Sequence, residues 1–192
     1  RFFCYDVFIS QGVYMFKIRN AYIADASVIY DIWSKGWQYA YKNILSQGFL
    51  EKRVGSDAVR EKIEKFPEKL NKEKTKGNIF LVLLDDDKII GFVSGGAPNS
   101  SECAADGELD MLYLDTNYIG KGVGKFLFQH FAKEMKQRGK KTFGLMCFSD
   151  NKSIGFYKKM GGRVTVERPS GEKFEYTMAS FLEFDIDDVL KK

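Results

Sequence analysis

The chain is 192 residues long, which predicts a single domain at roughly 150 residues per domain. Its net charge is only +4, too weak a balance to indicate nucleic-acid binding by itself. It has one histidine, His130, which excludes sites that need two, such as an HExxH zinc helix. Cys4, Cys103 and Cys147 form neither a CxxC motif nor a disulfide framework, and no apolar run approaches the roughly 18 residues of a membrane span. We therefore expect a cytoplasmic protein with no metal site and no membrane segment.

The first 14 residues differ in character from the rest of the chain. They are apolar and aromatic, but they include Asp6 and lack the Ala-x-Ala pattern of a signal-peptide cleavage site. We expect residues 1–14 to be an extension of uncertain role and residues 15–192 to form one domain. The alternative is that the extension adds an N-terminal strand to the fold.

Periodicity and turn signals predict the helices and strands. In chain order they predict a strand, two helices, three strands, a helix, a strand, a helix and two strands, at 16–20, 26–33, 51–76, 79–84, 89–94, 108–114, 123–138, 142–148, 153–160, 163–168 and 174–184. Asp25 stands at the N-cap position of the first helix, and the second is expected to be interrupted near Pro67. The aromatic segment 37–50 is predicted to be irregular. This order indicates a mixed α/β fold with helices packed on one sheet.

The most specific motif is Tyr-Ile-Gly-Lys-Gly-Val-Gly-Lys at residues 118–125, between a predicted strand and a predicted helix. Glycines allow a tight turn and a close backbone approach, and free N–H groups at a helix N-terminus attract anions. Lys121 and Lys125 add positive charge, so we expect a phosphate or pyrophosphate ligand. A P-loop is excluded because Ile119 stands at its first glycine position and Phe126 at its Ser/Thr position. A GxGxxG dinucleotide motif is also excluded, because neither register ends on glycine.

Three blocks of sequence carry a family resemblance through their order and spacing: ELDMLYL at 108–114, GKGVGKFLF at 120–128 and NKSIGFYKKMGG at 151–162. Together they resemble the GNAT superfamily of acetyl-CoA-dependent N-acetyltransferases, strongly over 108–164 and more loosely over 16–184. The family pattern Arg/Gln-x-x-Gly-x-Gly is matched except that Ile119 replaces Arg or Gln, which we expect to be tolerated because backbone N–H groups hold the pyrophosphate. The resemblance implies a mostly antiparallel sheet, with a central parallel strand pair splayed for the cofactor and helices on both faces.

The resemblance also implies where the cofactor acetyl-CoA binds. Backbone groups of one strand would pair with the pantetheine amides, and one N–H there would stabilise the thioester oxygen. The implied cofactor-binding residues are Met111, Leu112, Tyr113, Leu114, Ile119, Gly120, Lys121, Gly122, Val123, Gly124, Lys125, Asn151 and Tyr157. For Asn151 the alternative is a loop residue that caps the following helix.

Four further assignments concern the chemistry and the acceptor. Tyr157 is the implied acid that protonates the departing thiolate, and a packed helical aromatic is the alternative. Glu108 is the implied base and acceptor-binding residue; Asp110, on the same strand face by alternation, is a second candidate. Either acid is otherwise only a charge at the strand end. Trp37 and Tyr41, four residues apart, either wall the acceptor pocket or belong to the core.

We therefore expect direct acetyl transfer from acetyl-CoA to a primary amine, either a small molecule or a peptide, in a ternary complex. Cys147 lacks a base partner and His130 belongs to a packed helical stripe, so no acyl-enzyme is expected. Acidic residues near the cleft favour a cationic acceptor. The alternative function is a non-catalytic acyl-CoA-binding sensor. Nucleic-acid binding through 51–76 is disfavoured because glutamates offset its lysines, and a monomer and a homodimer both remain open.

Overall fold

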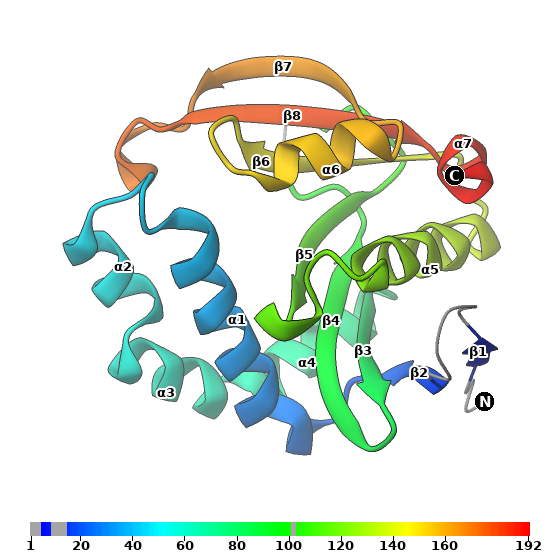
Figure 1. Cartoon of the computed structure of the whole chain (residues 1–192), viewed down its shortest axis with the longest axis horizontal. Helices are drawn as coiled ribbons and strands as arrows, with labels where there is room; N and C mark the ends of the chain where they lie inside the picture. The colour runs from blue at the N-terminus through cyan, green and yellow to red at the C-terminus, as the bar shows by residue number, and fades with distance from the viewer. Residues whose placement is uncertain (1–4, 9–14, 101–102) are drawn as a thin grey trace.

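The computed structural model describes residues 5–8, 15–100 and 103–192, whose strands and helices surround one sheet (Figure 1). The strands are β1 (Tyr5–Phe8), β2 (Met15–Asn20), β3 (Ile79–Asp85), β4 (Lys88–Gly96), β5 (Glu108–Leu114), β6 (Thr142–Phe148), β7 (Arg163–Pro169) and β8 (Met178–Asp185). The α-helices are α1 (Ala26–Tyr41), α2 (Gln47–Val54), α3 (Ser56–Glu64), α4 (Phe66–Thr75), α5 (Val123–Gln137), α6 (Ser153–Lys159) and α7 (Ile186–Lys191). Short 3-10 helices are η1 (Ile23–Asp25), η2 (Thr116–Tyr118) and η3 (Glu172–Phe174). No helix among the described residues is long and apolar enough to span a membrane.

The sheet has the strand order β1-β2-β3-β4-β5-β6-β8-β7, and all neighbouring pairs are antiparallel except β5 and β6. A parallel pair needs a crossover, and the crossover here is η2, the glycine-rich loop and α5. The predicted fold class, a mostly antiparallel sheet with one central parallel pair, is confirmed.

Two hydrophobic cores lie on opposite faces of the sheet because side chains alternate along each strand. In β3, Leu81 and Leu83 face the core that contains α5 and α7, whereas Phe80 and Val82 face the core that contains α1, α2 and α4. Helices therefore cover both faces, as the resemblance implied. The parallel strand pair lies between these two layers.

The helical region between β2 and β3 differs from the sequence prediction. Helix α1 continues through Tyr41 and includes part of the aromatic segment that was expected to be irregular. The Lys- and Glu-rich stretch forms three helices: one break, at Lys65, lies near Pro67 as predicted, and a second, at Gly55, was not predicted. Pro67 lies in the first turn of α4, where its missing N–H has no intrahelical partner to lose.

Two further expectations are corrected. Asp25 stands at the N-cap position of α1 but does not cap it; its carboxylate accepts hydrogen bonds from Arg19 at 2.7 and 2.9 Å and from the Tyr22 N–H at 2.8 Å. Strand β8 begins at Met178 rather than at 174, because η3 and two residues with positive φ, Glu175 (54°) and Tyr176 (55°), precede it.

The N-terminal segment contributes one strand to the described structure. Residues 5–8 form β1, which pairs with β2 in antiparallel register from Tyr5 opposite Ile18 to Phe8 opposite Met15. The other residues of 1–14 lie outside the described part of the chain, and the role of this extension stays a prediction.

Candidate active site

A cleft opens where the parallel strands β5 and β6 separate. Within the described residues of β5 and β6, Glu108 and Gly144 are the only pair that lie opposite each other in register. The Gly144 N–H donates to the Gly107 carbonyl at 2.9 Å. Beyond this point lies a cavity of about 570 Å³, bounded by β5, β6, α1, α6 and the loop before α5. The cleft therefore closes at the start of β5 and opens toward the glycine-rich loop.

Most residues predicted to bind the cofactor lie in the wall of this cavity. They are Met111, Leu112, Tyr113, Leu114, Ile119, Gly120, Gly122, Gly124, Lys125, Asn151 and Tyr157. Two of the predicted residues do not line it. Lys121 is exposed with its ammonium 5.8 Å from the centre of the Tyr118 ring, and Val123, the first residue of α5, is buried in the core.

The glycine-rich loop, residues 119–124, leads into α5 with backbone geometry suited to an anion. Gly120 and Gly122 have φ values of +80° and +82°, and a Cβ at either position would meet nothing within 4 Å. Helix α5 begins without a side-chain cap and without an acidic residue in its first turn. Its free N–H groups and the positive end of its dipole therefore remain available for a phosphate or pyrophosphate.

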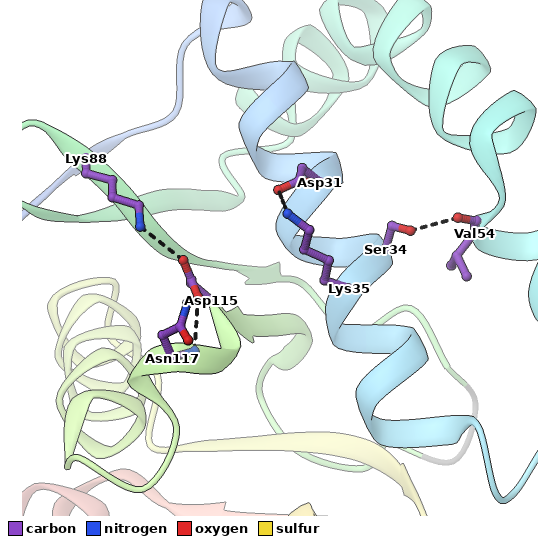
Figure 2. A network of polar contacts seen from close by, with 7 residues as sticks. All are labelled: Asp31, Ser34, Lys35, Val54, Lys88, Asp115 and Asn117. Carbon is purple, nitrogen blue, oxygen red and sulfur yellow. Dashed lines mark hydrogen bonds and ion pairs between the residues drawn. The ribbon is translucent and has the colours of Figure 1, made fainter.

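Two sets of polar contacts hold the elements on either side of the cleft (Figure 2). At the end of β5, the Asp115 carboxylate accepts a hydrogen bond from Lys88 at 3.2 Å and from the Asn117 N–H at 3.0 Å, which fixes the start of η2 ahead of the loop. On α1, the Ser34 hydroxyl donates to the Val54 carbonyl at 2.7 Å and ties α1 to α2. The loop is thus anchored to strand β4 of the sheet, and the α1 wall is anchored to α2.

Tyr41, Cys147 and Tyr157 come from three different elements and line the same cavity. Burial raises the pKa of all three groups, that of the Cys147 thiol to about 12. Near neutral pH each group therefore stays protonated. Cys147 lacks the thiolate form that a nucleophile requires, whereas the two tyrosines keep a proton that can be donated.

Trp37 and Tyr41 lie together, as their spacing predicted, but only Tyr41 lines the cavity. Their ring centroids are 4.6 Å apart. Trp37 is buried against Phe49, and the Arg53 guanidinium lies 5.0 Å from its ring centre. Trp37 therefore packs behind the cavity wall, against Tyr41 and Tyr113, which both line the cavity.

The two candidate carboxylates occupy different environments. Glu108 is buried, and its Oε2 accepts the backbone N–H groups of Asn99 at 2.7 Å and Ser100 at 2.9 Å. Asp110 lines the cavity, and its Oδ1 accepts the side-chain amide of Asn99 at 2.9 Å. Both acids thus face the same loop, in agreement with the predicted shared face, but of the two only Asp110 is part of the cavity wall.

A β-bulge places Asp110 at this position. The register between β4 and β5 shifts so that Ser94 lies opposite Met111 and Gly95 opposite Leu109, which leaves Asp110 unpaired. Asp110 is exposed at its surface, but partial desolvation within the cavity and, more weakly, the charge of Glu108 raise its pKa to about 6. A carboxylate with this pKa can accept a proton near neutral pH.

Asn151 and His130 both have structural roles. The buried Asn151 Oδ1 accepts the Ser153 N–H at 2.9 Å at the start of α6, so it holds the helix start while lining the cavity. His130 lies in the buried stripe of α5, where burial lowers its pKa to about 4. It is therefore neutral near pH 7 and lies among core residues, as the sequence predicted.

Sequence reasoning missed several residues of the cavity wall. Gly36 and Tyr39 come from α1, in or beside the segment that was read as irregular, so periodicity gave no signal for them. Lys152 and Lys159 also line the cavity, and they flank Asn151 and Tyr157 in the same motif. Together with Lys125, these exposed lysines place positive charge at the open end of the cleft. Asp110 lies near its closed end, two residues from the point where β5 and β6 pair.

Comparisons with known proteins agree with this arrangement. The family model described as the acetyltransferase (GNAT) family matches residues 29–162. A spermidine N(1)-acetyltransferase of Thermoplasma acidophilum is 28% identical over 150 residues, which covers 77% of this chain and 88% of the relative. The PaiA N-acetyltransferase of the same organism, solved with coenzyme A, has a TM-score of 0.69 at 24% identity and covers 88% of this chain and 98% of its own. A putative acetyltransferase from Salmonella typhimurium, solved with acetyl-CoA, has a TM-score of 0.65 at 19% identity over 90% of this chain and 94% of its own.

Proposed function

Because the chain belongs to the GNAT family of acetyltransferases, we propose that it transfers the acetyl group of acetyl-CoA directly to a primary amine in a ternary complex. The observation that carries this proposal is the charge distribution along one continuous cavity. Lysines line its open end beside the glycine-rich loop, and Asp110 lines its closed end. Such a cavity fits an anionic cofactor at one end and an ammonium group at the other.

The residues present fit acetyl-CoA, which supplies the activated thioester. The glycine-rich loop offers free N–H groups and open space for the pyrophosphate. One edge of Met111–Leu114 pairs with β4 and the other faces the gap left by β6, so the N–H and C=O groups on the β6 side are available to an extended amide-bearing arm. One of these N–H groups would stabilise negative charge on the thioester oxygen.

The proposed acceptor is a cationic amine, either a small molecule or a peptide amine. Asp110 supports a positively charged acceptor because its carboxylate lines the cavity without a cationic partner within ion-pair distance in the described residues. The relative named for spermidine acetylation is consistent with this class, since spermidine is an aliphatic polyamine. We therefore place polyamines first among the amines to be tested.

For the base, we propose Asp110 ahead of Glu108. The Glu108 carboxylate is buried and already holds two backbone N–H groups, so a direct role would require it to break those contacts. Asp110 lines the cavity and takes one proton from the acceptor ammonium, which leaves the neutral nitrogen lone pair free to form the bond to the acetyl carbon.

For the acid, we propose Tyr157. Its hydroxyl gives a proton to the sulfur as the C–S bond breaks, and the resulting phenolate takes the remaining excess proton from the new amide nitrogen. The balance is then complete: the products are the amide and the thiol, and the proton held by Asp110 passes to solvent. No acyl-enzyme is formed, because the thiol of Cys147 stays protonated.

Thiol release from acetyl-CoA tests the transfer reaction. Wild-type protein, incubated with a panel of polyamines, amino acids and peptides, should release thiol with at least one cationic amine. The Asp110→Asn variant should lose about 10²-fold or more in kcat, whereas Glu108→Gln should retain turnover with the same amine. Tight acetyl-CoA binding with no thiol release from any amine would instead favour the sensor function. Loss of activity in Glu108→Gln with full activity in Asp110→Asn would return the base role to Glu108.

A further inference from the structure

Asn99 connects the two carboxylates of β5 through two different parts of the same residue. Its backbone N–H donates to Glu108 Oε2 at 2.7 Å, and its side-chain amide donates to Asp110 Oδ1 at 2.9 Å. Ser100 adds a second backbone N–H to the same Glu108 oxygen at 2.9 Å. The buried carboxylate thus holds the loop backbone, and the loop residue holds the carboxylate that lines the cavity.

From these contacts we propose that Asn99 is a positioning residue, which orients the Asp110 carboxylate toward the acceptor and keeps it ionised, while Glu108 fixes the backbone of Asn99. The proposal rests on Asp110 as the base of the proposed function. It gives Glu108 a role that matches its contacts: an anchor for the loop.

The geometry defines which oxygen remains for chemistry. Asn99 occupies Oδ1 of Asp110, and no hydrogen bond to Oδ2 occurs within the described residues. A carboxylate held at one oxygen loses rotational freedom, so its second oxygen keeps a constant direction. The acceptor ammonium would therefore meet Oδ2, while the amide dipole of Asn99 stabilises the charge on the group.

Most groups around Asp110 disfavour its ionised form, and the hydrogen bond from Asn99 opposes them. Glu108 lies on the same strand, and Glu73 lies on α4; both make ionisation of Asp110 less favourable, as does partial desolvation. Lys69 of α4 favours ionisation, but its own pKa is lowered mainly by burial. Asn99 is a neutral donor, so its contribution does not depend on the protonation state of a neighbour. Its removal should shift the titration of Asp110 upward.

The test compares Asn99→Ala with Asn43→Ala, which removes an exposed asparagine between α1 and α2. Carbon-13 NMR titration of the Asp carboxyls, with the Asp110 signal assigned by its loss in Asp110→Asn, should show the Asp110 midpoint raised by about half to one pH unit in Asn99→Ala only. The acidic limb of kcat/KM against pH should move by the same amount, with the KM for acetyl-CoA unchanged. Asn99→Asp, which places a carboxylate in the same position, should raise the Asp110 midpoint and the acidic limb further.

An unchanged Asp110 midpoint in Asn99→Ala would overturn the positioning role, whatever the enzymatic assay shows. A midpoint that moves while the kcat/KM limb stays fixed would instead overturn Asp110 as the base, and the further inference would fall with it. Because the NMR titration needs no acceptor, failure of the proposed reaction and failure of the positioning role are distinguishable.

Discussion

At the scale of single residues, the cavity combines tyrosine hydroxyls that stay protonated near neutral pH with a carboxylate that ionises there. Tyr157 and Tyr41 have raised pKa values because their partly buried rings are desolvated, whereas Asp110 ionises near neutral pH. This difference supports the proposal of a phenol as the acid and a carboxylate as the base, a pair that needs no histidine. His130, on the buried face of α5, is neutral and has no part in the proposed chemistry.

The Tyr157→Phe variant tests the proposed acid. Loss of the hydroxyl should lower kcat by about 10²- to 10⁴-fold, the usual contribution of a general acid, and should leave acetyl-CoA binding intact because the ring remains. Stopped-flow or steady-state thiol release measures the rate, and isothermal titration calorimetry measures binding. Tyr176→Phe is the matched control, since Tyr176 is 65% exposed and does not line the cavity. Full turnover in Tyr157→Phe would remove the acid role.

The sequence could predict Tyr157 but could not separate the two acids. Tyr157 lies in a block that resembles the GNAT family, and only this resemblance singled it out as a candidate acid, a role that stays a prediction. Strand alternation placed Glu108 and Asp110 on one face, and both do contact Asn99. Which of them lines the cavity depends on the β-bulge opposite Ser94 and on the course of a loop from β4. Both features depend on distant pairing, so no local pattern contains them.

At the scale of elements, the loop before α5 is the one whose backbone conformation matters most. Gly122 adopts φ +82° and is open to the cleft. Alanine at this position should cost about 1–2 kcal/mol of stability, as expected for a left-handed residue, and its methyl group would intrude where a phosphate binds. The Kd for acetyl-CoA should therefore rise by about tenfold or more.

Gly77→Ala is the matched control for Gly122→Ala. Gly77 has φ +70°, with nothing within 4 Å of its added Cβ, and it lies in the turn after α4, outside the cavity wall. Both variants should lose similar stability in urea unfolding, but only Gly122→Ala should weaken binding in calorimetry. Equal affinity for acetyl-CoA in the two variants would contradict a phosphate site at the loop.

Elements with a strong amphipathic pattern were predicted well, and elements organised by tertiary packing were not. Helix α5 agrees with its apolar stripe to within one residue of the predicted end. In contrast, α1 extends across an aromatic segment in which Trp37 packs on Phe49 and Tyr41 on Phe148, tertiary contacts that periodicity does not reveal. Gly55 has an extended backbone and separates α2 from α3. Pro67 lies in the first turn of α4, where a proline does not disrupt the helix.

At the scale of the whole molecule, the sheet is weakest where the cleft is. Strands β1 to β5 and strands β6 to β8 are each joined by continuous antiparallel ladders, but β5 and β6 share one pair in register. Helix α5 spans the gap, since its core includes both Leu83 of β3 and Phe143 of β6. A ligand that fills the cleft would therefore add contacts between two halves that otherwise meet mainly through α5 and its neighbours.

This organisation predicts a large stabilisation by the cofactor. Acetyl-CoA at 100 times its Kd should add about 2.7 kcal/mol to the free energy of unfolding, because it binds the folded state alone. For a domain of this size that corresponds to a Tm increase of roughly 5–10 °C, measurable by differential scanning fluorimetry. At the same cofactor concentration, Gly77→Ala should show the full increase and Gly122→Ala a smaller one. Equal increases in both would mean that the stabilising contacts lie outside the glycine-rich loop, and no increase in wild-type protein would mean that the cleft does not bind the cofactor at that concentration.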